Sequence, residues 1–198
     1  MKKTRKALLL GVCAVLLVTA SVLGTMAYLT ATTDTITNTF TVGKVAITLD
    51  EAKVNPDGTP VAGADRVKAN AYKLMPGSTY TKDPTVHVAA DSEDSYVFVK
   101  VENGIANLEA GGDFTIANQI TTKGWAPLDG VANVYYQKYE NQNTDKDLVV
   151  FEKFIILNDA NTKTEWSNIT NAQVKITAYA IQADGFDTAK AAWNAGNF

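Results

Sequence analysis

The sequence predicts an all-β protein, built as a sandwich or barrel of short strands. Stretches of alternating apolar and polar residues recur along the chain, as at 174–182. Turn signals separate them, such as Asn-Pro-Asp-Gly at 55–58 and Met-Pro-Gly-Ser at 75–78. Helical character is confined to an Ala-rich stretch near the C-terminus. We therefore expect about seven to nine strands in one domain, with minor helical elements.

The predicted strands differ in whether one face or both faces are expected to be buried. Val97, Val99 and Val101 share one face of their strand. The stretch 148–157 is apolar on both faces, which predicts a central strand buried on both sides. We expect a surface loop over 56–72 and a short helix over 187–195, capped by Asp187. The predicted strands are 35–42, 45–49, 85–89, 96–102, 114–116, 134–139, 148–157 and 174–182, the last with Val174, Ile176, Ala178 and Ala180 facing inward.

The first 27 residues have the three parts of a secretory signal peptide. A basic region at 2–6 precedes an apolar run at 7–23, and small residues follow at 25–27. Cleavage is predicted between Ala27 and Tyr28, which leaves one domain over 28–198. The apolar run is long for a signal peptide, so an uncleaved membrane anchor is the alternative. Either way the protein is expected outside the cell, in a matrix or at the cell surface.

The charge of the chain limits the classes of partner that it can bind, and its cysteine content excludes disulfides. The chain has 18 basic and 21 acidic residues, and the signal segment holds four of the basic ones and no acid. The remaining 14 basic and 21 acidic residues give a net charge of −7, which argues against nucleic acid and anionic lipid as partners. The one cysteine, Cys13, lies in the signal segment, so we expect no disulfide in the secreted chain.

No catalytic or metal-binding motif is recognisable, so we expect no enzyme activity, no cofactor and no metal site. His87, the one histidine, lies in a strand opposite valines, as a partly exposed strand residue would. Two acidic loops are candidate calcium sites, but a solvated turn is the interpretation we favour because Lys146 replaces the glycine that a calcium-binding loop needs. The candidate ligands are Asp91, Glu93 and Asp94 in one loop, and Asn141, Asn143, Asp145, Asp147 and Glu152 in the other.

Aromatic residues leave a binding module open as an alternative. Tyr135 and Tyr139 share one side of a predicted strand, while Trp125 and Trp166 lie near turns. Such residues line sugar-binding faces, although packing in a core is their more frequent use.

Four stretches together resemble the TasA/camelysin family of secreted Gram-positive proteins. They are the cleavage region at 23–30, the strand at 38–47, the Leu-Met-Pro-Gly turn at 74–84 and the late strand at 174–182. The resemblance covers about the first half of the chain, and 103–146 has no counterpart in it. It implies a jelly-roll-like β-sandwich, export through a dedicated signal peptidase and, for some members, polymerisation into biofilm-matrix fibres. The family's metalloprotease label finds no support in the residues, because His87 has no partners at ligand spacing.

The resemblance also implies that the N-terminal segment of one subunit becomes a strand in the next. Residues 28–39 are Thr-rich and contain neither Pro nor Gly, as an extended segment should. Tyr28, Leu29, Ile36 and Phe40 are the candidate residues of this assembly strand. The partners we expect are further copies of the chain and other matrix proteins. A plain flexible terminus or an ordinary first strand remains the alternative.

Overall fold

The computed structural model describes Cys13, Leu16 and residues 43–158 and 172–198. Cys13 and Leu16 are helical and belong to a separate unit over residues 1–41. The larger unit spans residues 42–198 and holds every strand that the structure describes. Within the described residues, no helix has both the length and the apolar character needed to cross a membrane.

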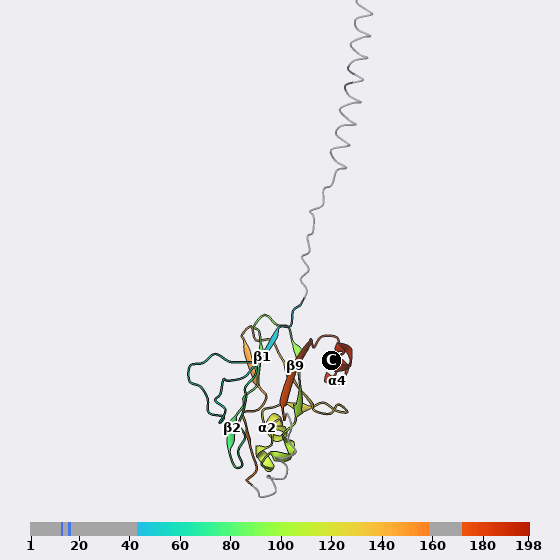
Figure 1. Ribbon diagram of the computed structural model, residues 1–198. Coiled ribbons are helices and arrows are strands. Elements are labelled where there is room, and N and C mark those ends of the chain that lie inside the picture. The colour runs from blue at the N-terminus through green and yellow to red at the C-terminus, as the bar shows by residue number, and fades with distance from the viewer. Residues whose placement is uncertain (1–12, 14–15, 17–42, 159–171) are drawn as a thin grey trace, which may run out of the picture. The chain divides into compact units, whose positions relative to one another are not determined.

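The described part of the chain is an all-β domain with antiparallel strands in three sheets (Figure 1). One sheet has the order β1-β3-β7, another β5-β6-β4-β9, and β2 pairs with β8. Two α-helices and two short 3-10 helices complete it. The elements are β1 (Ile47–Asp50), β2 (Thr79–Thr81), β3 (Thr85–Val88), β4 (Ser95–Asn103), η1 (Ala106–Leu108), η2 (Gly112–Phe114), α2 (Ile116–Thr122), β5 (Ala126–Pro127), β6 (Val134–Tyr139), β7 (Lys146–Val149), β8 (Lys153–Ile155), β9 (Val174–Gln182) and α4 (Ala189–Gly196).

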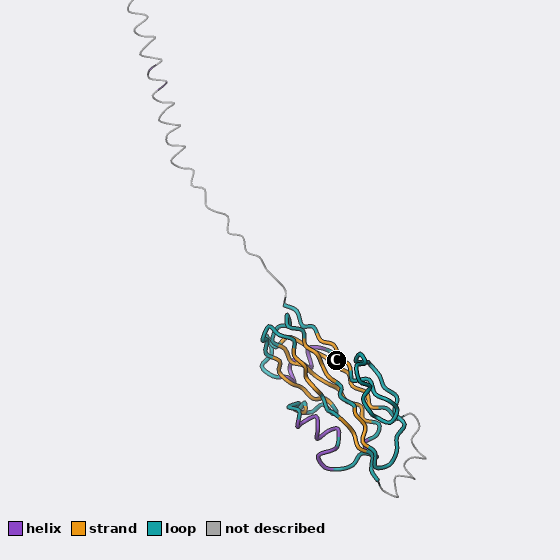
Figure 2. Tube along the Cα trace, turned by 90° about the vertical axis from the view of Figure 1, so that its left-hand side faces the viewer, coloured by secondary structure: helices purple, strands orange, loops and turns teal. Residues whose placement is uncertain are grey.

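The long strand β4 separates two hydrophobic cores because its side chains alternate between faces. Val97 and Val99 point into the main core, where they join Val86 and Val88 of β3. This core is thus shared by the three-stranded and four-stranded sheets, and Figure 2 shows the strands of the domain, in orange, running in similar directions. Phe98 faces the opposite way, into a smaller core that α4 covers. In Figure 1, α4 lies beside β9 and α2 lies near the other end of the strands.

Most of the sequence predictions within 43–158 and 172–198 are confirmed. Strands occur at 85–88, 95–103, 134–139 and 174–182, close to the predicted ranges. The apolar residues of β9 pack against the main core as expected. Both turns form, with the left-handed backbone that each needs supplied by Gly58 (φ +84°) and Gly77 (φ +73°). The strand predicted over 35–42 lies outside the described residues.

The single central strand predicted over 148–157 is wrong. The segment forms β7, at the edge of the three-stranded sheet, and then β8, which pairs with β2. Between them Val150 donates to Pro84 O, and the side chain of Gln119 accepts from the backbone of Glu152. The stretch is apolar on both faces because the chain crosses between sheets inside the core, where Val150 and Phe151 are fully buried.

Two further predictions need correction. No strand forms over 114–116; η2 ends at Phe114, and the hydroxyl of Thr115 accepts from Asn118 N to begin α2. The C-terminal helix is present, but Asp187 is not its cap. Thr188 occupies the N-cap position and accepts a hydrogen bond from Ala191 N. Both cases show local side-chain capping deciding where a helix begins.

Candidate functional site

A cleft opens between β1 and β9, the edge strands of the two larger sheets. Among the described strands, each of these pairs with a neighbour on one side only, β1 with β3 and β9 with β4. The cleft has a volume of about 1310 Å³. Pockets for small ligands occupy about 300–1,000 Å³, so this cleft has room for something larger, such as an extended segment of chain.

The floor of the cleft is apolar. It is lined by Ile47 and Leu49 of β1, Val174 and Ile176 of β9, and Phe154 of β8. The four residues from β1 and β9 are only partly buried, although all of them pack against the main core. The main core therefore reaches the surface along this line, and an apolar strand laid there would complete its burial.

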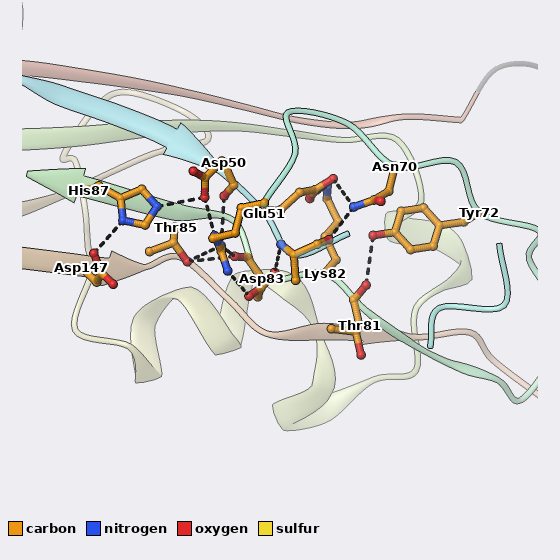
Figure 3. A network of polar contacts seen from close by, with 12 residues as sticks. Asp50, Glu51, Asn70, Tyr72, Thr81, Lys82, Asp83, Thr85, His87 and Asp147 are labelled. Atoms are coloured by element: carbon orange, nitrogen blue, oxygen red, sulfur yellow. Dashed lines mark hydrogen bonds and ion pairs between the residues drawn. The ribbon is translucent and has the colours of Figure 1, made fainter. Parts of the chain in front are cut away.

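One wall of the cleft is the segment 66–74, which a polar network holds in place (Figure 3). Arg66 is the cation at the centre of this polar network. Its guanidinium donates to the carboxylates of Asp50, at the end of β1, and Asp83. It also donates to the hydroxyl of Thr85. Because Arg66 presents several donors in a fixed plane, it ties the loop to β1 and β3 together.

A second part of the network centres on Glu51, whose side chain is almost fully buried. One carboxylate oxygen accepts from Lys82 Nζ at 2.5 Å, and the other accepts from Asn70 Nδ2 at 3.0 Å. Asn70 also bonds the backbone of Ala52 and Val54. A buried charge pair is costly unless each member is paired and hydrogen-bonded, as these are.

His87 lies on the outer face of the three-stranded sheet, between two carboxylates. Its Nε2 is 2.9 Å from Asp50 and its Nδ1 is 2.6 Å from Asp147. The expected strand position is confirmed, but the residue has acidic partners that the sequence did not indicate. Because Asp50 also contacts Arg66, His87 belongs to the same network that borders the cleft (Figure 3).

The two acidic loops make structural hydrogen bonds and ion pairs. Asp91 pairs with Lys44, Asp94 accepts from Asn141 N, and Asp145 accepts from Ala90 N. Within 43–158 and 172–198 the structure contains no group of three acidic, histidine or cysteine side chains placed to hold a metal ion.

The aromatic residues considered for sugar binding are mostly core residues. Trp125 is fully buried, and its Nε1 donates to Val149 O at 2.9 Å. Tyr139 is buried, and Tyr135 packs against the main core. Trp166 lies outside the described residues. The described part of the chain therefore offers no exposed tryptophan platform of the kind that we considered.

The residues predicted to act in cleavage and assembly lie outside the described residues. These are Ala27 and Tyr28 at the cleavage point, and Tyr28, Leu29, Ile36 and Phe40 in the assembly strand. What the structure adds is the cleft, which the sequence did not indicate.

The chain matches no protein-family model, no curated protein and no solved structure.

Sequence reasoning missed Glu51, Arg66, Asn70 and Lys82. They belong to no motif, and 66–70 falls inside the predicted surface loop. The sequence did contain one indication that this loop is packed against the domain. Val67 and Tyr72 lie close to Arg66 and Asn70 in the sequence, and such apolar or aromatic residues are more often packed than fully exposed. The backbone of Val67 indeed pairs with that of Glu51.

Proposed function

We propose that this chain is a secreted structural protein that assembles into extracellular fibres of a biofilm matrix. In the proposed fibre, the N-terminal segment of one subunit lies as a strand in the β1–β9 cleft of the next. The subunit fold in this proposal is a jelly-roll-like β-sandwich, and the protein acts without cofactor or catalysis. The observation that carries the proposal is the apolar cleft between two edge strands, which an added strand would fill.

The chemistry of the cleft suits an added strand. An edge strand has unpaired backbone N–H and C=O groups that can hydrogen-bond to an added strand. These backbone hydrogen bonds provide affinity that does not depend on the sequence of the added strand. Side chains on alternate positions provide specificity. In 28–42, Ile36 and Phe40 share one face because they are four residues apart. Two apolar side chains on one face match a floor formed by Ile47, Leu49 and Ile176.

The geometry of exchange explains why fibres would result. Donor segment and acceptor cleft are different surfaces of one subunit, so each contact joins head to tail. Such a contact produces a filament unless the rotation between subunits closes a ring. The resemblance of 23–30, 38–47, 74–84 and 174–182 to the TasA/camelysin family supports the same assignment. Cleavage between Ala27 and Tyr28 would then free the donor segment.

Electron microscopy of the secreted chain, residues 28–198, tests the proposal. We expect negatively stained filaments from the intact chain and none after deletion of 28–38. Circular dichroism of the deleted chain should still report a folded β protein. A chain that stays monodisperse and monomeric at high concentration, with and without added seeds, would contradict the proposal.

A second experiment tests the cleft separately from the donor. Ile176→Lys places a charge on the apolar floor and should abolish filaments, whereas the control Gln182→Lys, on an exposed position of the same strand, should retain them. A chain without 28–38 but with an intact cleft should bind the Ile176→Lys chain, which has an intact donor. Mixing the two should give dimers and no filaments. Filaments from Ile176→Lys alone would show that this cleft is not the acceptor.

A further inference from the structure

Three reactive side chains meet in the lining of the cleft: the buried amine of Lys82, the buried carboxylate of Glu51 and the partly buried side-chain amide of Asn70. Lys82 Nζ lies 2.5 Å from one oxygen of the carboxylate, and Asn70 Nδ2 lies 3.0 Å from the other. One carboxylate therefore holds an amine and an amide together (Figure 3). An amine is a nucleophile, an amide carbon is an electrophile, and a carboxylate moves protons between them.

Water has little access to the Lys82–Glu51 pair, although both residues line the cleft. The side chains of Lys82 and Glu51 are 10% and 6% exposed. The ring of Tyr72 stands nearby and packs edge-on against Phe154 and Tyr80, with centroids 5.3 Å and 5.9 Å away. Burial also raises the pKa of the Tyr72 hydroxyl. Low exposure strengthens each polar interaction and limits the water that can compete with the amine for the amide carbon.

The amide of Asn70 is held in one orientation. Its oxygen accepts from Val54 N at 3.0 Å, and its nitrogen donates to Ala52 O at 2.8 Å as well as to Glu51. The hydrogen bond from Val54 would stabilise negative charge on that oxygen if the amide carbon were attacked. The carboxylate of Glu51 stands on the side of the departing nitrogen, where a proton is needed.

We propose that Lys82 and Asn70 join in an intramolecular amide bond, formed by the protein itself with Glu51 as the proton carrier. Glu51 takes a proton from the Lys82 ammonium, and the free amine attacks Cγ of Asn70. The new bond is Nζ–Cγ, and the bond that breaks is Cγ–Nδ2. Glu51 returns its proton to Nδ2, and a second proton passes from Nζ to the leaving nitrogen. The nitrogen departs as ammonium, Glu51 ends as a carboxylate, and no other reactant is consumed.

The proposed bond would tie together two parts of the chain that shape the cleft. Asn70 belongs to the wall at 66–74, and Lys82 lies between β2 and β3. Holding two reactants in one orientation raises their effective concentration greatly, which is why a reaction between a lysine and an unactivated amide becomes feasible here. A covalent tie also stabilises by restricting the unfolded chain, a role that disulfides cannot take in a domain without cysteine.

Mass spectrometry of the intact, denatured full-length chain tests the proposal. We expect the mass to fall short of the sequence mass by one ammonia. Glu51→Gln and Lys82→Arg should each restore the full mass of their own sequence, while the exposed control Lys53→Arg should keep the loss. A full sequence mass for the unaltered chain would overturn the proposal and leave a plain buried ion pair.

A tryptic map of the unaltered chain decides the matter even if the variants fail to fold. Trypsin cannot cut after a lysine whose amine is in an amide bond. We therefore expect peptide 69–73 to be joined to an uncut peptide 74–100, with fragment ions that place the link at Lys82 and Asn70. Free peptides ending at Lys82, or an ammonia loss confined to the Asn103-Gly104 pair, where a succinimide would also lose ammonia, would overturn it.

Discussion

Nε2 of His87 lies 2.9 Å from the carboxylate of Asp50, so a side-chain contact joins the middle strand β3 to the edge strand β1. The same imidazole reaches Asp147 of β7 through Nδ1, on the other side. One residue thus links all three strands of the sheet on its outer face. A neutral imidazole has a single N–H, so both contacts are hydrogen bonds to carboxylates only when the ring is protonated.

Stability should therefore depend on the protonation of His87. Burial by itself lowers the pKa of His87, but hydrogen bonds to Asp50 and Asp147 and their negative charges raise it above its ordinary value of about 6.5. Because the folded pKa is the higher one, the stabilisation is complete below about pH 6.5 and is lost as pH rises through the folded value. The cost of His87→Gln in free energy of unfolding, measured by urea titration at several pH values, should shrink over that range.

The partner residue supplies the control. Asp147→Asn keeps the shape of the side chain but removes one of the two charges that raise the pKa of His87. In the Asp147→Asn variant, the stabilisation by protonated His87 should therefore be lost at a lower pH than in the unaltered chain. A cost of His87→Gln that stays constant with pH would contradict the protonated bridge.

Gly58 should tolerate no side chain, for two separable reasons. Its φ is +84°, and a Cβ there would lie 2.7 Å from Cα of Tyr80. Gly63 has a similar φ of +70° but has open space around it. Gly63→Ala therefore costs the backbone strain alone, about 1–2 kcal/mol, and Gly58→Ala should cost clearly more. Equal losses in chemical denaturation would show that the contact with Tyr80 relaxes without cost.

Trp125 should behave as a core residue. Trp125→Ala removes a fully buried ring and should lower the free energy of unfolding by about 3–5 kcal/mol. Trp125→Phe keeps an aromatic ring but loses the hydrogen bond to Val149 O, so its loss should be smaller. Urea denaturation followed by circular dichroism measures both. Unchanged stability together with lost binding to a glycan would revive the surface-binding alternative.

The structure and the sequence prediction differ by one residue at the N-cap of α4, which is Thr188 and was predicted to be Asp187. Thr188→Ala removes the acceptor for Ala191 N at 3.1 Å and should cost about 1 kcal/mol. Asp187→Ala, at the position that the sequence favoured, should cost less. Thermal denaturation of both variants is the measurement, and a larger loss at Asp187 would reverse the assignment.

Strands and turns could be predicted where the deciding interactions are local. Alternation along 96–102 and 174–182 requires one face to be buried, and the structure places Val97 and Val99 in the core. Gly58 and Gly77 mark turns because few other residues adopt a left-handed backbone. The helix start at Thr188 was missed by one residue, since Asp187 and Thr188 are both good caps and only the structure shows that the Thr188 hydroxyl accepts from Ala191 N.

The sequence by itself determined the all-β class, most of the described strands and the two turns, because periodicity and backbone preference are properties of short segments. Only the tertiary structure decided that 148–157 divides between two sheets, since Val150 and Phe151 are buried where the chain crosses between them. It also decided the cleft between β1 and β9, because which strands lie at sheet edges depends on pairing across the whole chain. The tertiary structure also decided the contact between Glu51, Asn70 and Lys82. These residues are 12 to 31 positions apart in the sequence, so only the folded chain brings them together.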